Sequence, residues 1–123
     1  MTAKKKILVV DDEMPVCEAI AMLLSFEGHE VVTAGSGRDA LGLFAPGRFD
    51  LVTIDYKMPE MSGAELALAL KATAPDQPII MITAHADALQ SSAVPLTGVD
   101  HVVNKPFLVA ELREAIKKIL AVE

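Results

Sequence analysis

Aromatic residues are scarce in this chain of 123 residues, which has no tryptophan, one tyrosine and four phenylalanines. Hydrophobic residues nevertheless make up 52% of the chain and charged residues 23%, a balance that is typical of folded globular domains and excludes a disordered chain. The interior must therefore be built from aliphatic side chains. Because most domains contain about 100–200 residues, we expect residues 1–123 to form one domain.

Cysteine is nearly absent, and so are long apolar runs. Cys17 is the only cysteine, which excludes a disulfide within the chain and fits a reducing compartment. The lysine-rich start of the chain leads into a short apolar run that ends at Asp11 and Asp12. Such a run is too short for a signal peptide or for a membrane helix of about 20 residues. We therefore expect a cytoplasmic protein that makes no membrane contact.

Positive charge is in the minority, with 11 lysines and arginines against 17 acidic residues and a net charge of −6. Basic residues are adjacent to one another only in residues 4–6 and 117–118. Binding to nucleic-acid phosphates requires clustered cations. The composition therefore predicts that this chain does not bind nucleic acid directly.

Short, continuous aliphatic runs recur along the chain. Four of them, residues 7–10, 51–54, 79–82 and 102–103, are rich in isoleucine and valine. Continuous runs of this kind fit strands that are buried on both faces of a parallel sheet. A fifth run, residues 31–33, follows polar residues and predicts an edge strand.

Helical spacing of apolar residues is found between these runs. The periodic positions are Val16, Ile20, Leu23 and Leu24; Leu41 and Phe44; Leu66 and Leu70; and Leu108, Leu112, Ala115, Ile116 and Ile119. Ser36 and Ser62 each precede an acidic residue by three positions, the pattern of a helix start. The weakest helical segment, residues 87–94, is expected to form the fourth helix.

The alternation of strands and helices predicts an α/β fold. We expect a doubly wound, five-stranded parallel sheet of order 2-1-3-4-5, with five helices divided between its two faces, which is a flavodoxin-like (βα)5 arrangement. Right-handed crossover connections between parallel strands support this order.

Reactive side chains follow four of the predicted strands. Asp11 and Asp12 follow the first, Asp55 the third, Thr83 the fourth and Lys105 the fifth. Ligands of open α/β sheets bind at the carboxyl ends of the strands. Three crowded carboxylates repel one another unless a hard cation lies among them, and Mg²⁺ prefers oxygen ligands together with phosphate oxygens. The pattern predicts a site that stabilises a phosphate group on a carboxylate.

Four stretches carry a family resemblance: residues 7–13, 55–63, 81–84 and 105–107. Their order and spacing resemble the receiver domain of bacterial two-component response regulators, which includes the single-domain chemotaxis response regulator. The resemblance covers essentially the whole chain, and the four stretches together are highly specific.

The resemblance implies a magnesium or manganese site. Asp12 would bind the metal ion directly, and Asp11 would support it, largely through water. Asp55 and the backbone carbonyl of Lys57 would be further ligands.

The resemblance also implies a switch and not a conventional enzyme. Asp55 would be the phosphoacceptor, Thr83 would donate a hydrogen bond to the phosphoryl group, and Lys105 would pair with it. The Lys105–Pro106 peptide bond is often cis in this family.

The partners implied are a sensor histidine kinase or phosphotransfer protein, and a downstream protein or output domain. The second would be contacted through the fourth helix, the fifth strand and the fifth helix. Two arrangements are compatible with the sequence: a protein that acts alone, and the receiver part of a longer regulator.

Some positions depart from the family pattern or vary within it. Val102 stands where many members have an aromatic residue of the switch, so a flip of an aromatic ring is excluded here. Lys57 and His85 flank the expected path of an attacking water. We expect them to slow loss of the phosphoryl group, with catalysis of that loss by His85 as the alternative.

Three rival functions fit the sequence less well. A phosphatase with an aspartyl phosphate usually needs a second aspartate two residues beyond the first, where this chain has Glu13. A flavin-binding electron carrier needs a phosphate loop that Asp11 and Asp12 would repel. A degenerate receiver used only for protein contact conflicts with the complete set of acids, Thr83 and Lys105. The plainest alternative gives Asp11 and Asp12 only a helix-capping role.

Overall fold

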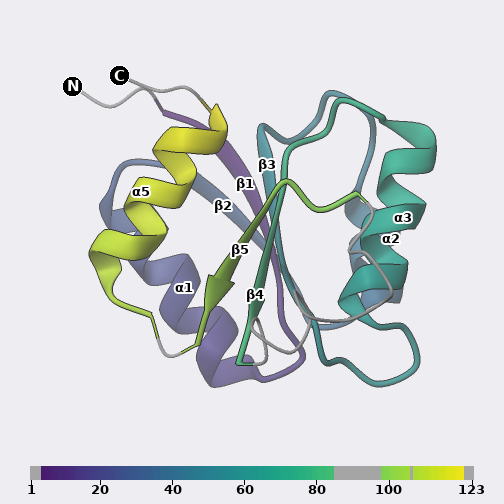
Figure 1. The fold of residues 1–123 in the computed structure, drawn as a ribbon, viewed down its shortest axis with the longest axis horizontal. Helices are drawn as coiled ribbons and strands as arrows, with labels where there is room; N and C mark the ends of the chain where they lie inside the picture. Colours follow the sequence, from purple (N-terminus) through teal and green to yellow (C-terminus); the bar gives the residue numbers. More distant parts are fainter. Residues whose placement is uncertain (1–3, 85–97, 106, 121–123) are drawn as a thin grey trace.

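The computed structural model describes residues 4–84, 98–105 and 107–120, and it contains one parallel sheet with helices on both faces (Figure 1). The strands lie in the order β2-β1-β3-β4-β5, so the predicted fold and strand order are confirmed. The elements are β1 (Lys6–Val10), α1 (Met14–Phe26), β2 (Glu30–Ala34), α2 (Gly37–Leu43), β3 (Leu51–Asp55), α3 (Gly63–Thr73), β4 (Ile79–Thr83), β5 (His101–Asn104) and α5 (Val109–Leu120). The fourth helix, expected at residues 87–94, lies outside the described residues.

Two aliphatic cores lie on either side of the sheet. Helices α1 and α5 cover one face, and α2 and α3 cover the other (Figure 1). Alternate strand residues supply the two cores: Ile7 and Val9 face α1 and α5, whereas Leu8 and Val10 face α2 and α3. Of the five aromatic residues only Phe49 is buried. The prediction of an aliphatic interior is therefore confirmed.

The predicted starts of two helices are confirmed in atomic detail. The Ser36 hydroxyl oxygen accepts a hydrogen bond from the Asp39 N–H at 3.0 Å. Ser62 and Glu65 form a reciprocal capping box, in which each side chain accepts from the backbone N–H of the other, at 3.1 and 3.2 Å. Such caps satisfy N–H groups that have no partner within the helix. None of the described helices has the length and apolar content to cross a bilayer.

Two leucines among the periodic positions of the helices are exposed. Leu41 is exposed, because α2 packs on the sheet through Gly37 and Ala40 instead. Leu108 is 70% exposed, because α5 begins one residue later, at Val109. A residue that precedes the first helical turn does not share the face of the helix.

Thr53 carries a buried hydroxyl group that has no hydrogen-bond partner among the described residues. It lies in the middle of β3, between Val9 of β1 and Ile80 of β4. An unsatisfied buried hydroxyl costs about 1–3 kcal/mol. We therefore expect Thr53→Val to raise the free energy of unfolding by about 1 kcal/mol, as measured by urea denaturation. Thr33→Val, at an exposed position of β2, is the control and should change it little; a loss of stability in Thr53→Val would show that the hydroxyl is paired.

Candidate functional site

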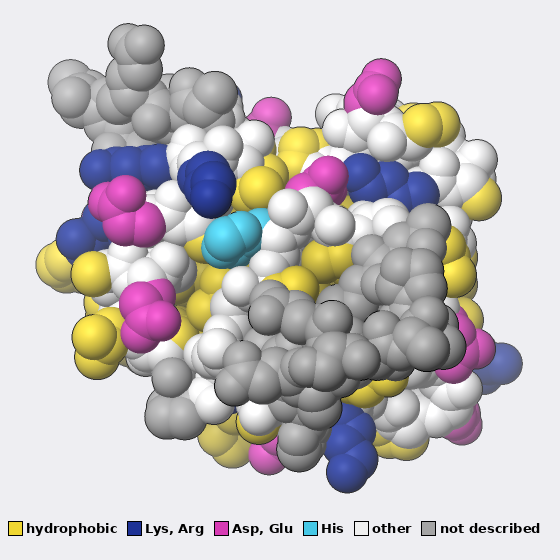
Figure 2. Space-filling model, viewed as in Figure 1, with side chains coloured by type: hydrophobic (Ala, Val, Ile, Leu, Met, Phe, Trp, Pro, Cys, Tyr) yellow, Lys and Arg dark blue, Asp and Glu magenta, His cyan; other side chains and the backbone are white. Residues whose placement is uncertain are grey.

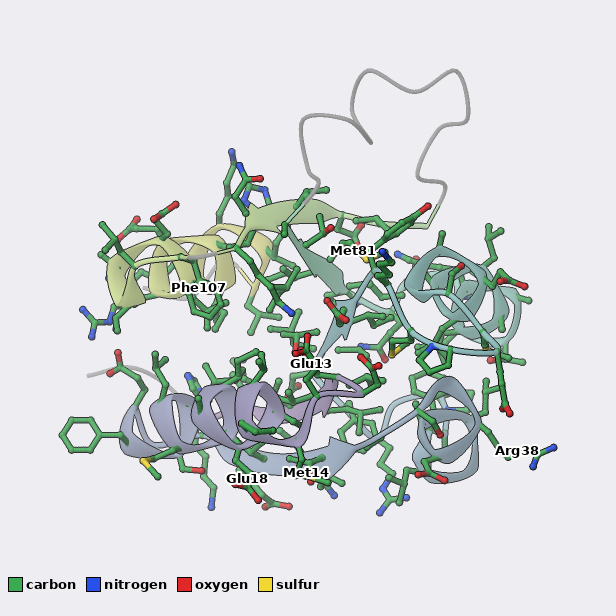
Figure 3. All side chains as sticks on the ribbon, turned by 90° about the horizontal axis from the view of Figure 1, so that it is seen from below. Glu13, Met14, Glu18, Arg38, Met81 and Phe107 are labelled. Carbon is green, nitrogen blue, oxygen red and sulfur yellow. The ribbon has the colours of Figure 1, made fainter. Side chains whose placement is uncertain are left out.

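The functional side chains meet at the carboxyl edge of the sheet. Asp11 follows β1, Asp55 ends β3, Thr83 ends β4 and Lys105 follows β5. Because the strands are parallel, their carboxyl ends lie at one edge, and the loops that leave them converge there. Glu13, labelled in Figure 3, marks the loop from β1 to α1 at this edge.

Three carboxylates gather at this edge. Asp11, Asp12 and Asp55 each offer a carboxylate oxygen, and these oxygens lie within 4.8 Å of one another. Asp11 and Asp55 are only 1% and 6% exposed, whereas Asp12 is open to solvent. The donor set is entirely oxygen and is reached from one open side. Such a set fits a hard divalent cation that keeps part of its water shell, as Mg²⁺ does.

Lys105 contacts the two buried carboxylates of the cluster. Its Nζ atom donates to Asp55 Oδ1 at 2.9 Å and to Asp11 Oδ2 at 3.1 Å. These are charge-assisted hydrogen bonds between mostly buried groups, which are stronger than neutral ones. The three carboxylates and the ammonium group of Lys105 together carry a net charge of −2, which a divalent cation would neutralise.

Burial and neighbouring charges shift the pKa values of two groups in the cluster. Burial raises the pKa of the Asp55 carboxyl above its ordinary value, and the charges of Asp11 and Asp12 add to this effect, while the hydrogen bond from Lys105 opposes it. For Lys105, burial lowers the pKa, but the hydrogen bonds to Asp55 and Asp11 and the charges of these two carboxylates together outweigh burial and leave the pKa raised. A cation among the carboxylates would favour their charged form.

The loop from β1 to α1 does not cap the helix with its aspartates. Glu13 is the N-cap residue of α1, and its side chain makes no capping hydrogen bond. Asp11 instead accepts a hydrogen bond from the Glu13 N–H at 2.9 Å through Oδ1, while its Oδ2 binds Lys105. The plain capping alternative therefore does not account for these two aspartates.

Thr83 lies at the end of β4, and Lys57 follows the end of β3. Thr83 is buried, and its carbonyl oxygen accepts from the Lys105 N–H at 2.9 Å, so the end of β4 fixes the residue that carries the ammonium group. The Lys57 side chain is exposed, two residues beyond Asp55. The roles of the Thr83 hydroxyl and of the Lys57 carbonyl stay predictions. Pro106 and His85 lie outside the described residues.

Gly63 is the site residue whose role was missed from the sequence. Its N–H donates to the Tyr56 carbonyl at 2.7 Å, which ties the start of α3 to the end of β3. A Cβ atom at this position would lie 2.4 Å from the Asp55 carbonyl oxygen and 2.8 Å from the Tyr56 Cα. Only glycine permits this approach. The one signal in the sequence was the Ser-Gly pair at the helix start.

Comparison with known proteins places the chain in a family. The family model described as response regulator receiver domain matches residues 7–117. "Response regulator MprA" of Mycolicibacterium vanbaalenii is 38% identical over 115 residues, which cover 94% of this chain and 50% of MprA. "Probable transcriptional regulatory protein TcrX" of Mycobacterium tuberculosis is 36% identical, with 93% of this chain and 49% of TcrX covered. The chain thus spans about half the length of these curated relatives.

Solved structures agree with this placement. The response regulator protein TrrA of Thermotoga maritima, determined in complex with Mg(2+)-BeF, is 39% identical, has a TM-score of 0.86, and matches over 94% of this chain and 99% of its own. Because some relatives are named as transcriptional regulators and are about twice as long, the expectation of no nucleic-acid contact concerns only the residues of this chain. The fold, the strand order and the family match together show that this chain belongs to the receiver domains of two-component response regulators.

Proposed function

We propose that Asp55 accepts a phosphoryl group and that the chain is a phosphorylation-dependent switch. The observation that carries the proposal is the position of Lys105, whose Nζ contacts Asp55 and Asp11 at 2.9 and 3.1 Å while three carboxylates converge within 4.8 Å. A buried carboxylate beside an ammonium group and an acidic metal site has the parts that phosphoryl transfer to a carboxylate requires.

The chemistry follows from these positions. A carboxylate oxygen of Asp55 attacks phosphorus, and the bond between phosphorus and the leaving oxygen of the donor breaks as the new bond forms. Lys105 would pair with a phosphoryl oxygen, and Thr83 at the end of β4 would donate a hydrogen bond to another. Mg²⁺ or Mn²⁺, when held by Asp11, Asp12, Asp55 and the Lys57 carbonyl, supplies positive charge for the phosphoryl oxygens.

The proposed partners are the donor of the phosphoryl group and the protein that responds to the phosphorylated chain. The donor is a sensor histidine kinase, a phosphotransfer protein or a small phosphodonor in the cytoplasm. The signal passes to a downstream protein or to an output domain of a longer regulator. This chain would contact that partner through the fourth helix, β5 and α5. Figure 2 shows that α5 presents basic and acidic side chains side by side, which suits a specific, polar contact with a protein.

Labelling tests the proposal. With Mg²⁺ and acetyl phosphate, the protein is expected to gain one phosphoryl group, as measured by intact mass, and chelation of the metal with EDTA should prevent the gain. A protein that is never labelled, or is labelled equally in EDTA, would contradict the proposal.

Metal binding is expected to depend on Asp12. Asp12→Ala should weaken Mg²⁺ at least about tenfold in a calorimetric titration, because it removes an exposed ligand of the cluster. Glu13→Ala is the matched control, since it removes the neighbouring exposed carboxylate that lies outside the cluster. Equal affinities for the two variants would remove Asp12 from the metal site.

A further inference from the structure

The β3–α3 loop, residues 56–62, leads away from the acidic cluster toward the start of α3. Its two ends are tied together by the backbone hydrogen bond of 2.7 Å between Tyr56 and the first residue of α3. Between these ends, the side chains of Lys57, Pro59 and Glu60 are exposed, so their packing does little to hold the loop. The conformation of the loop must therefore depend on its other residues.

Glu60 has a left-handed backbone conformation in the middle of this loop. Its φ is +67°, and it is the one residue other than glycine with a positive φ in the described ranges. The Met61 N–H donates to the Pro59 carbonyl at 2.7 Å, which closes a tight three-residue turn around Glu60. A residue with a side chain pays a cost for this conformation, which persists only where the surroundings enforce it. The contacts of the next residue, Met61, supply such enforcement.

Met61 packs against the start of α2. Its side chain is half-buried and contacts the core between the sheet and helices α2 and α3. A Cβ atom at Gly37, the first residue of α2, would lie 2.8 Å from the Met61 Sδ atom and 3.1 Å from its Cβ atom. Gly37 is not among the glycines with a positive φ, so this contact, and not the backbone conformation, calls for glycine there.

Met58 is the second apolar anchor of the loop. It is 8% exposed and belongs to the same core as the residues that Met61 contacts. The peptide bond of the Met58 N–H is also that of the Lys57 carbonyl, the backbone group expected to bind the metal ion. The anchors at Met58 and Met61 thus hold the loop on both sides of the exposed residues between them. Methionine suits this task because its flexible thioether fills irregular gaps.

We propose that Met61 is a positioning residue, whose contact with Gly37 holds the β3–α3 loop so that the Lys57 carbonyl can serve as a ligand of Mg²⁺. The inference rests on the metal site of the proposed function and adds a residue that lies outside that site. A thioether is a poor ligand for Mg²⁺, so Met61 acts through the loop and not on the metal ion itself. A backbone ligand has no side chain that fixes it, so its orientation depends on the packing of its loop.

Truncation of Met61 tests this role by calorimetric titration with Mg²⁺. Met61→Ala should weaken the affinity by about tenfold, whereas Met61→Leu, which keeps an apolar side chain against Gly37, should restore most of it. Leu43→Ala is the matched control, because Leu43 is also partly buried against this core but lies at the far end of α2. Both alanine variants should lower the midpoint of urea denaturation, but only Met61→Ala should lose affinity. An equal loss in both would show a merely structural role and overturn the proposal.

Gly37→Ala tests the contact from its other side. The added Cβ would displace the Met61 side chain, so the affinity for Mg²⁺ should fall as it does in Met61→Ala. In a protein that already carries Met61→Ala, the added methyl group no longer meets this side chain, and Gly37→Ala should cause no further loss. Losses that simply add would show that the two residues act independently and would overturn the proposal.

Two substitutions of Glu60 test the turn that carries Met61 to Gly37. Both remove the same exposed carboxylate, but glycine accepts a positive φ and β-branched valine resists it. Glu60→Val should therefore bind Mg²⁺ about fivefold more weakly than Glu60→Gly, and equal affinities would contradict the proposal. A wild type that does not bind Mg²⁺ would refute the proposed metal site as well. Wild-type binding that is unchanged in Met61→Ala would refute the positioning role alone.

Discussion

Replacing Asp55 with asparagine is expected to abolish phosphoryl labelling while the protein stays folded. An amide oxygen is not a nucleophile. Asp55 is the last residue of β3, and its carboxylate contacts Lys105. The two side chains have nearly the same shape, so the buried position is filled and Lys105 keeps an acceptor. Intact mass after treatment with acetyl phosphate and Mg²⁺ should show no gain for the variant.

The control for this experiment is Asp76→Asn, which removes an exposed carboxylate far from the carboxyl edge of the sheet. It should be labelled like the wild type. Labelling of Asp55→Asn to the same extent would show that another residue is the phosphoacceptor.

Replacing Gly63 with alanine is expected to lower the free energy of unfolding by about 2–4 kcal/mol. The added Cβ would meet the Asp55 carbonyl oxygen at 2.4 Å and the Tyr56 Cα at 2.8 Å. Both are backbone atoms, so relief requires a shift of the strand end that carries the phosphoacceptor. The rate of labelling should therefore fall together with stability. Urea denaturation and timed intact-mass measurements give the two quantities.

Gly42→Ala is the matched control, because this glycine lies within α2 and an added Cβ meets nothing within 4 Å. The exchange should stabilise the protein by about 0.5–1 kcal/mol, the usual gain for alanine in a helix. If Gly63→Ala were as stable as Gly42→Ala, the close packing of α3 on the end of β3 would be disproved.

The sheet could be predicted from sequence because its strands are short and buried on both faces. Continuous aliphatic runs at residues 7–10, 51–54 and 79–82 leave little alternative to central parallel strands. The exposed and half-buried residues of β2 likewise fit the edge position expected for residues 31–33. The cluster of Asp11, Asp12, Asp55 and Lys105 followed from the same logic, since each residue lies just beyond or at the end of a strand.

Helix α1 shows the limit of this reasoning. Ile20 and Leu24 are buried, and Val16 and Leu23 pack against the same core, as their spacing predicts, but the spacing did not identify the buried Cys17. Because α1 is apolar around most of its circumference, several faces satisfy the same spacing rule, and only packing against the sheet decides between them. The contact of Gly63 with the end of β3 likewise depends on how closely two segments approach. It produces no periodic pattern in the sequence.

The absence of tryptophan gives the single tyrosine a practical use. Tyr56 directly follows Asp55, and its carbonyl holds Gly63 at the start of α3. Its ultraviolet emission is therefore not masked by a stronger fluorophore, and it arises from the residue next to the acidic cluster. The unmodified protein thus contains an intrinsic optical probe, whose intensity can be followed during titration with a metal ion or a phosphate mimic.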